Sequence, residues 1–220
     1  MKETQQKEST IQKDGLIEAL NDKSVQKTVQ YYKEWLVRKE IIKSYSYFHL
    51  PDEYYLVFKK LIDYFSLKEP KKGILCFGDY GCYKTSIMRF FQALCNEYSQ
   101  EDEKFKVHRF KYVNSRSIIL KLISQGGMEE AIRYAAGKVS TSDVYCFDEI
   151  GREMLINNYG IQINIITEIL AMRYDNRLIT HGITNFSKEK LTERYGQYIV
   201  DRMFESFIPI KFPNFNARIK

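Results

Sequence analysis

The sequence predicts an α/β protein built on a mostly parallel, five-stranded sheet with helices on both faces. From about residue 46, short apolar runs alternate with longer segments whose apolar residues recur at helical spacing. Strands that alternate with helices are typical of parallel sheets. At 220 residues, 44% hydrophobic and 28% charged, the chain can bury a core of one domain and carry a helical arm as well.

The elements of this core follow one another in a regular order. Strands are expected at 73–77, 107–113, 144–148, 178–184 and 207–212. Helices are expected at 86–98, 118–124, 129–136 and 164–174, and the acidic stretch SQEDEKF (99–105) is expected to be a solvated loop. Ligands of such sheets bind at the carboxyl ends of the strands, so the functional site is expected there.

The amino-terminal part has a different composition. Residues 1–22 are polar and are expected to be mobile or loosely helical, whereas about 23–43 should form an amphipathic helix. Its apolar face would contain Val25, Val29, Tyr32 and Leu36. This face could pack against the rest of the chain or dock onto a partner. We therefore expect an arm over 1–45 and a core over 46–220.

Composition excludes several classes of protein. The four cysteines form no CxxC pair, and His49, His108 and His181 stand apart, which disfavours a disulfide scaffold or a zinc site and favours a reducing cytoplasm. No apolar run approaches the ~20 residues of a membrane helix, and the polar start lacks the apolar region of a signal peptide. A net charge of +6 permits nucleic-acid contact without requiring it.

A phosphate-binding loop is predicted between the first strand and the following helix. Residues 78–85 (GDYGCYKT) nearly match G-x-x-x-x-G-K-[ST], a loop whose backbone N–H groups bind phosphates. Lys84 would reach the β- and γ-phosphates of ATP, and the Thr85 hydroxyl would hold Mg²⁺. The candidate nucleotide-binding residues are Gly78, Asp79, Tyr80, Gly81, Cys82, Tyr83, Lys84, Thr85 and Ser86.

Tyr83 departs from the pattern, because it stands where the second glycine is expected. A non-glycine residue at positive φ costs about 1–2 kcal/mol, and the ring adds bulk beside the phosphates. Weak nucleotide binding or slow turnover is therefore a possible consequence.

An acidic pair ends the third predicted strand. Asp148 is expected to complete the Mg²⁺ shell together with Thr85, and Glu149 to orient and deprotonate the attacking water. By itself such a pair could also cap the next segment.

The sequence DEIGRE at 148–153 resembles the DnaC/IstB type of AAA+ ATPase. The resemblance extends over about 46–220 and includes Arg173-Tyr174, the stretch LTERYG at 191–196 and Asp201-Arg202-Met203. It implies an AAA+ core of the P-loop NTPase fold and a site that a neighbouring subunit completes, with no carboxyl-terminal lid.

The resemblance also assigns three polar residues. Asn185 matches a sensor residue that holds water or the γ-phosphate, although an Asn after a strand can be an ordinary turn residue. Arg202 matches an arginine finger that reaches the neighbour's nucleotide; the alternative is a surface salt bridge with Asp201 or Glu205. Arg218 matches a terminal arginine whose motif has asparagine in place of glycine and serine here.

The resemblance implies an ATP-dependent helicase loader of the DnaC type, which places a replicative helicase on single-stranded DNA as an ATP-dependent homo-oligomer. A phage or mobile-element origin is expected. Arg116, Lys121 and Arg133 would contact DNA or be solvated helix charges. The alternatives are an IstB-like transposition helper ATPase and a degenerate P-loop adaptor that binds nucleotide weakly. A small-molecule phosphotransferase shares only the phosphate-binding loop.

Overall fold

The computed structural model describes residues 15–41, 48, 50–117, 143–158 and 161–215. The chain forms two compact units, 1–67 and 68–220. The predicted helices at 118–124 and 129–136 lie outside the described residues. No helix in the described part is both long enough and apolar enough to cross a membrane.

The first unit is helical. A short helix at 15–21 precedes α2 (Lys23–Arg38), and α3 (Glu53–Phe65) packs against α2. The Asp22 carboxylate caps α2 by accepting hydrogen bonds from the Ser24 and Val25 N–H groups at 2.8 and 3.3 Å. The Ser24 hydroxyl donates to the same oxygen at 2.6 Å, and this bond, followed by those of the backbone, lowers the pKa of Asp22. The helix therefore starts where it was predicted, directly after its capping residue, and ends at Arg38, five residues earlier than expected.

The apolar face of α2 is buried, as its spacing predicted. The Tyr32 ring lies 5.4 Å from the Phe58 ring of α3, and Val25, Val29 and Leu36 are fully or almost fully buried. The sequence analysis did not predict α3, which belongs to the first unit although the core was expected to begin at 46. The division into an arm over 1–45 and a core over 46–220 stays a prediction.

The second unit contains the predicted five-stranded parallel sheet. Its strands are β1 (Gly73–Phe77), β2 (Phe110–Asn114), β3 (Val144–Ile150), β6 (Thr180–Thr184) and β7 (Phe207–Lys211). Their order is β2-β3-β6-β1-β7, and every pair is parallel. All five predicted strands are confirmed, which confirms the α/β class.

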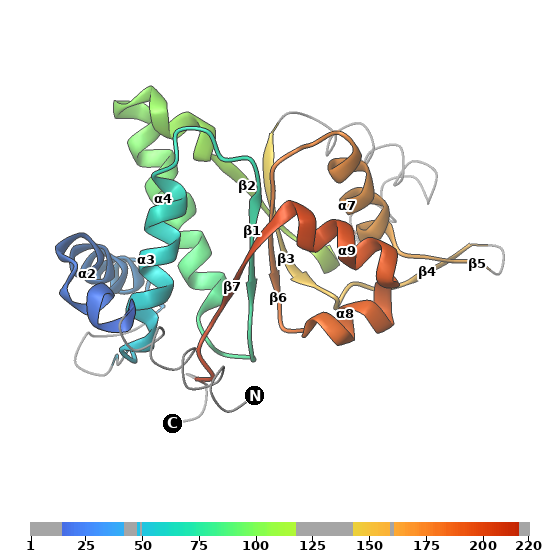
Figure 1. The fold of residues 1–220 in the computed structure, drawn as a ribbon, viewed down its shortest axis with the longest axis horizontal. Helices are drawn as coiled ribbons and strands as arrows, with labels where there is room; N and C mark the ends of the chain where they lie inside the picture. The colour runs from blue at the N-terminus through green and yellow to red at the C-terminus, as the bar shows by residue number, and fades with distance from the viewer. Residues whose placement is uncertain (1–14, 42–47, 49, 118–142, 159–160, 216–220) are drawn as a thin grey trace. The chain divides into compact units, whose positions relative to one another are not determined.

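Helices lie on both sides of this sheet. Figure 1 shows α4 (Lys84–Glu101) on one side and α7 (Ile165–Asp175) with α9 (Gln197–Ser206) on the other. The helix α8 (Lys188–Tyr195) precedes α9, and a two-stranded ribbon of β4 (Ile156–Asn158) and β5 (Ile161–Ile163) precedes α7. The helices α8 and α9 and the two-stranded ribbon were not predicted from the sequence.

The prediction of a solvated loop at 99–105 is wrong, because these residues are mostly helical. The helix α4 continues to Glu101, and a 3-10 helix, η2 (Glu103–His108), follows and displaces the start of β2 to Phe110. The physical reason is packing: the Tyr98 and Phe105 rings lie 5.4 Å apart, and Ser99 is buried. Apolar contact thus keeps this acidic stretch folded, although its charges point to solvation.

A buried arginine joins α7 to the sheet. Arg173 is 1% exposed and donates hydrogen bonds to Thr180 Oγ1 and Ile179 O, both at 2.7 Å, and to Asp143 O at 2.9 Å. Burial lowers its pKa to about 10. Because a buried cation needs several acceptors, this network fixes where α7 lies against β3 and β6.

His181 is a structural residue inside the sheet. Its Nδ1 accepts a hydrogen bond from the Ile74 N–H at 3.1 Å. Its ring lies at 79° to the Phe110 ring, with 5.0 Å between the two centroids. Burial lowers the pKa of His181 to about 3. The described residues contain no group of three or more His, Cys, Asp or Glu side chains that could hold a metal ion.

The buried His181 predicts a loss of stability in acid. The unfolded chain binds a proton below pH ~6.5 and the folded chain only near pH 3, so stability is full above pH 6.5 and falls as pH decreases through this window. Between pH 7 and pH 5 the loss is about 2 kcal/mol. Urea unfolding at both pH values should show this loss in the wild type and a smaller one in His181→Asn, which keeps an acceptor near Ile74. Equal losses would contradict the assignment.

Candidate nucleotide-binding site

The predicted phosphate loop joins the end of β1 to the start of α4. Gly78 and Gly81 have φ values of +150° and +80°. A Cβ on Gly78 would lie 3.1 Å from Phe212 O, at the point where the Phe212 N–H donates to Phe77 O at 2.8 Å. The loop therefore needs glycine at Gly78 both for its backbone angle and for the strand-end contact beside it.

Lys84 folds back over this loop. Its Nζ donates to Gly78 O at 2.8 Å and to Asp79 O at 2.6 Å, and Cys82 Sγ lies 3.1 Å away. The side chain is buried, yet its named partners are neutral carbonyls and a thiol. The full positive charge of the ammonium group therefore remains available to an anion bound in the loop.

Tyr83 occupies the left-handed region, with φ of +58°, as expected for a position that normally holds glycine. Its ring stacks on the Phe215 ring, with 5.9 Å between centroids and 30° between planes. Burial raises the pKa of the Tyr83 hydroxyl. The tyrosine thus gains an aromatic contact with the segment after β7, which offsets part of the backbone strain.

Two further candidate residues, Ser86 in the first turn of α4 and Tyr80 in the loop, also have contacts. The Ser86 hydroxyl donates to Tyr83 O at 2.9 Å. The Arg152 guanidinium lies 5.2 Å from the centroid of the Tyr80 ring, which is 45% exposed.

The two predicted metal ligands meet at the start of α4. The Thr85 hydroxyl donates to Asp148 Oδ2 at 3.0 Å; Thr85 is exposed and Asp148 is buried. A hydroxyl and a carboxylate are hard oxygen donors of the kind that Mg²⁺ prefers. These residues fit a Mg²⁺ ion that draws its other ligands from phosphates and water.

Glu149 follows Asp148 with a φ of +60°, an unusual value for glutamate. Its Oε2 accepts a hydrogen bond from Asn114 Nδ2 at 3.0 Å, and its Oε1 lies 3.7 Å from Arg152 Nη1. Its side chain is 35% exposed, so water can reach the carboxylate that is expected to act as the general base.

Asn114 is a site residue that the sequence analysis missed. Its side-chain oxygen accepts hydrogen bonds from the Arg116 and Ser117 N–H groups at 3.0 and 3.1 Å and so caps the next helical turn. This cap leaves the amide nitrogen to face Glu149. An Asn between a strand and a helix was the available signal, but only the pairing of β2 with β3 places it beside Glu149.

Tyr112, two residues earlier on β2, was also missed. Its hydroxyl donates to Asp148 Oδ2, and the Arg89 guanidinium lies 4.2 Å from the centroid of its ring. Burial, followed by the charge of Asp148, raises the pKa of the Tyr112 hydroxyl. It therefore stays protonated and remains a donor.

Glu153, in the stretch that carries the family resemblance, has a structural environment. Its buried carboxylate accepts hydrogen bonds from Gly151 N at 2.9 Å, Asn164 Nδ2 at 2.8 Å and Tyr195 OH at 2.7 Å. Arg194 pairs with it at 3.3 Å. This carboxylate holds together the turn after β3, the start of α7 and the end of α8.

Asn185 lies at the carboxyl end of β6, the strand between β1 and β3. The preceding Thr184 donates through Oγ1 to Ile150 O at 2.7 Å and accepts from the Phe186 N–H at 3.0 Å. These bonds fix the backbone on both sides of Asn185. Its sensor role stays a prediction.

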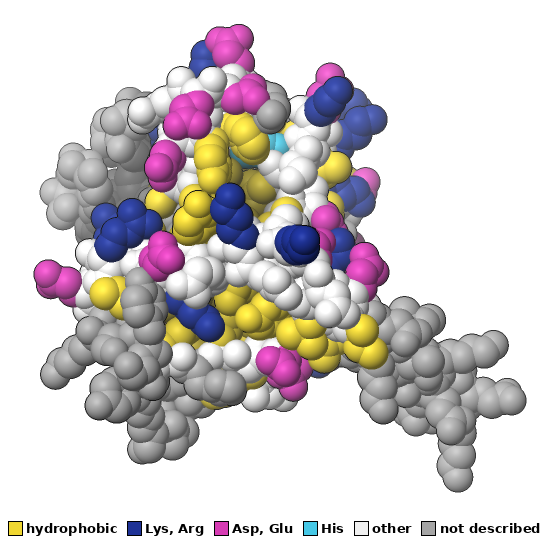
Figure 2. Space-filling model, turned by 90° about the vertical axis from the view of Figure 1, so that its left-hand side faces the viewer, with side chains coloured by type: hydrophobic (Ala, Val, Ile, Leu, Met, Phe, Trp, Pro, Cys, Tyr) yellow, Lys and Arg dark blue, Asp and Glu magenta, His cyan; other side chains and the backbone are white. Residues whose placement is uncertain are grey.

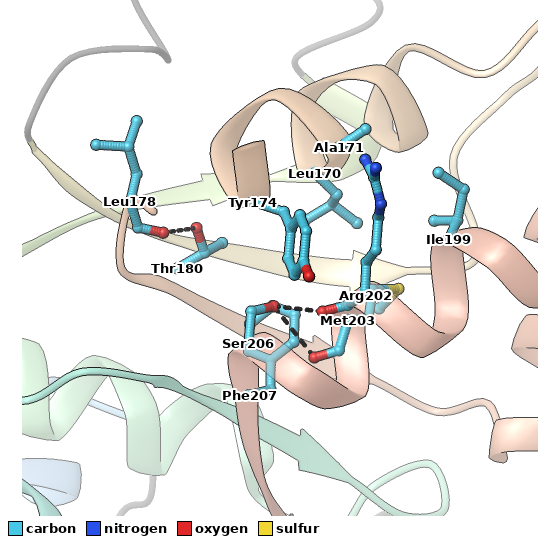
Figure 3. A pocket seen from close by; sticks show the side chains of 10 residues that line it. All are labelled: Leu170, Ala171, Tyr174, Leu178, Thr180, Ile199, Arg202, Met203, Ser206 and Phe207. Carbon is cyan, nitrogen blue, oxygen red and sulfur yellow. Dashed lines mark hydrogen bonds between the residues drawn. The ribbon is translucent and has the colours of Figure 1, made fainter. Parts of the chain in front are cut away.

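Arg202 contacts α7 and its own helix, α9. It pairs with Asp175 at 3.0 Å, and its guanidinium lies 4.1 Å from the Tyr198 ring and 4.9 Å from the Tyr174 ring. Figure 3 shows Arg202 and Tyr174 beside one another at a small cavity. The volume of this cavity is about 10 Å³, which is large enough only for water.

The salt-bridge partners expected for Arg202 are wrong. Asp201 accepts from Gln197 and Glu205 from Tyr174, whereas the partner of Arg202 is Asp175, which the packing of α7 against α9 brings close.

The remaining candidates are only partly described. Arg218 lies outside the described residues, as do Lys121 and Arg133. Arg116 is exposed in the turn that Asn114 caps.

Comparison with solved structures identifies the fold. The DnaC helicase loader matches over 76% of this chain and 94% of its own, with 18% identity and a TM-score of 0.50; DnaI matches over 77% and 90%, with 19% identity and 0.54. The replication initiator DnaA bound to AMPPCP and single-stranded DNA matches over 73% and 46%, with 13% identity and 0.50. No protein-family model and no curated protein matches the chain. The chain has the fold of the DnaC helicase loader and DnaI, as the resemblance implied.

Asn114 both caps the next helical turn and donates to Glu149, so the effect of the second contact on hydrolysis can be tested in a variant that keeps a capping oxygen. Asn114→Asp keeps a capping oxygen but replaces the donor with a carboxylate that repels Glu149. ATP hydrolysis should slow about tenfold or more, because a hydrogen bond to a charged group contributes ~1.5–3 kcal/mol. Both variants lose the hydrogen bond to Glu149, and Asn114→Ala should lose a further ~1 kcal/mol with the cap, so thermal unfolding is measured to show that each variant is folded at the assay temperature. Unchanged hydrolysis in Asn114→Asp would exclude a role for this contact.

The strained Tyr83 predicts a gain on substitution. Tyr83→Gly removes the bulk of the ring beside the phosphates, so ATP should bind about fivefold more tightly, a gain of ~1 kcal/mol. Titration with a fluorescent ATP analogue measures this. Phe215→Leu, which removes the stacked ring and keeps the strain, is the matched control and should bring no gain. Weaker binding by Tyr83→Gly would mean that the tyrosine itself contacts the nucleotide.

Proposed function

We propose that this protein is an ATP-dependent helicase loader of the DnaC type, which binds and hydrolyses ATP to place a replicative helicase on single-stranded DNA. One observation carries the proposal: Lys84, Thr85, Asp148 and Glu149 are assembled at the carboxyl ends of β1 and β3, in the fold of the DnaC helicase loader and DnaI. The rest of the mechanism follows from these groups.

ATP binding relies on the loop at 78–83 and on the start of α4. The backbone N–H groups of the loop and the positive end of α4 attract the phosphates, and Lys84 exchanges its carbonyl partners for phosphate oxygens. Thr85 and Asp148 would hold Mg²⁺, which when bound neutralises charge on the β- and γ-phosphates. Ser86 extends the site by one residue into the helix.

Hydrolysis places the proton of water on Glu149. The water oxygen forms a bond to the γ-phosphorus, the bond from that phosphorus to the bridging oxygen breaks, and ADP leaves. Asn114 orients the carboxylate that receives the proton, and Asn185 would hold the water or the γ-phosphate. Arg202 would act on a neighbouring subunit's nucleotide after release from Asp175.

The first unit would provide contact with the helicase. The predicted apolar face of α2 is already used against α3, so a partner would meet other surfaces of this unit. Exposed apolar side chains there are Ile17, Tyr31 and Ile41.

The proposed contact with DNA concerns basic side chains on the surface. On the face in Figure 2, the described Lys and Arg side chains are interspersed with Asp and Glu and form no continuous basic surface. Of the three basic residues expected to contact DNA, Arg116 lies in the described part of the chain, exposed beside Asn114. DnaA, which shares the fold, is bound to single-stranded DNA in its structure.

Two alternatives remain. An IstB-like transposition helper would use the same ATP site and differ in its partner. A degenerate adaptor is motivated by Tyr83 and its contact with Phe215, and would bind nucleotide weakly without hydrolysis.

The ATPase reading makes a specific prediction for two variants. Lys84→Ala should abolish saturable ATP binding, whereas Glu149→Gln should keep binding and lose hydrolysis by about 10²–10⁴-fold. Phosphate release and nucleotide titration distinguish them, and Lys71→Ala, an exposed lysine before β1, is the matched control. Wild-type protein that binds ATP without Mg²⁺-dependent hydrolysis would support the adaptor instead.

Co-purification with a replicative helicase or a transposase as bait, with and without ATP, then distinguishes the loader from the transposition helper.

A further inference from the structure

A tyrosine and an arginine outside every recognised motif lie beside the candidate metal ligand. Tyr112 comes from β2 and donates to Asp148, and Arg89 comes from α4 and lies against the Tyr112 ring. Neither residue belongs to the phosphate loop or to the acidic stretch after β3. The fold brings them together by pairing β2 with β3 and by directing α4 from the end of β1.

Three donors hold the carboxylate of Asp148. The Thr85 and Tyr112 hydroxyls donate to Oδ2, and the Glu149 N–H donates to Oδ1 at 2.9 Å. A carboxylate offers about four acceptor positions, so about one remains, on Oδ1. The carboxylate is therefore fixed in orientation before any cation binds, with one acceptor position on Oδ1 left for the cation.

Tyr112 is itself held in place. The Arg89 guanidinium, on an exposed residue of α4, lies 4.2 Å from its ring centroid, a geometry typical of a cation–π contact. Tyr112 is half-buried, and the contact with Arg89 restrains its ring. Arg89 lies one helical turn after Thr85, which places both on the side of α4 that faces Asp148.

We propose that Tyr112 is a positioning residue for the Mg²⁺ that accompanies the nucleotide, acting through Asp148, with Arg89 restraining the tyrosine ring. The inference rests on the proposed function, since it concerns the same site. Partners of this kind, which touch a ligand and not the metal, commonly change metal affinity by 10–100-fold when removed.

The experiment measures cation binding separately from hydrolysis. A fluorescent ATP analogue is titrated onto the full chain over a series of Mg²⁺ concentrations and in EDTA. Tyr112→Phe, which removes only the hydroxyl, should raise the Mg²⁺ concentration at half-saturation about tenfold and leave nucleotide affinity in EDTA within about twofold. Arg89→Gln, a change at an exposed residue, should shift it in the same direction by a smaller factor.

Tyr195→Phe is the matched control. It also removes a tyrosine hydroxyl from a buried carboxylate, that of Glu153, which is not a candidate metal ligand. It should lower thermal stability and leave Mg²⁺ half-saturation unchanged.

The outcomes separate the inference from the function on which it rests. A Mg²⁺ half-saturation within twofold of the wild type in Tyr112→Phe overturns the inference while the ATP site stands. A parallel loss of nucleotide affinity in EDTA overturns it in favour of a purely structural role. If the wild type binds no nucleotide with or without Mg²⁺, the proposed function fails first and the inference with it.

Discussion

The parallel pairing of β3 between β2 and β6 is the constraint on which the candidate site depends. The register places Asn114 opposite Asp148 and Phe77 opposite Thr184, so the carboxyl ends of four strands finish at one edge of the sheet. Because parallel strands send their chains onward from the same edge, the phosphate loop, the acidic pair and Asn185 all leave the sheet there. A slip of one residue in β2 would turn Tyr112 and Asn114 to the other face and remove both hydrogen bonds to the acidic pair.

Backbone strain is concentrated at this edge. Among the described residues, four non-glycine residues have positive φ. Glu40 and Arg177 directly follow helix ends, where such angles are common. Tyr83 and Glu149 instead belong to the phosphate loop and the acidic pair, and each left-handed residue costs about 1–2 kcal/mol. Strain of this kind persists where the surrounding contacts hold the backbone in place, here the Phe215 ring for Tyr83 and Asn114 for Glu149.

Buried polar networks fix the elements around the site. Arg173 joins α7 to β3 and β6, and Glu153 joins the turn after β3 to the start of α7 and the end of α8. Since an unpaired buried charge costs several kcal/mol, each network specifies one arrangement of its neighbours. Arg202, by contrast, is partly exposed and held by an ion pair and two aromatic rings, contacts that can exchange for others at modest cost.

The local sequence determined the five strands of the parallel sheet and the phosphate loop. Alternating apolar runs located all five strands of the sheet, and the spacing from Gly78 to Thr85 located a loop whose φ values at Gly81 and Tyr83 are left-handed, as the motif requires. Period and spacing are short-range properties, so they can be read along one segment. The acidic stretch at 99–105 shows the limit of this reading, because the Tyr98–Phe105 contact outweighed its charge.

Only the tertiary structure decided the partners across strands. Tyr112 and Asn114 lie more than thirty residues from the carboxylates to which they donate, and Asp175 lies 27 residues from Arg202. The Glu153 network likewise spans up to 42 residues. Such pairs depend on strand order, register and helix packing, which arise from the sum of many contacts and leave no fixed spacing in the sequence. The motif therefore specified the chemistry of the site, and the fold specified which side chains orient it.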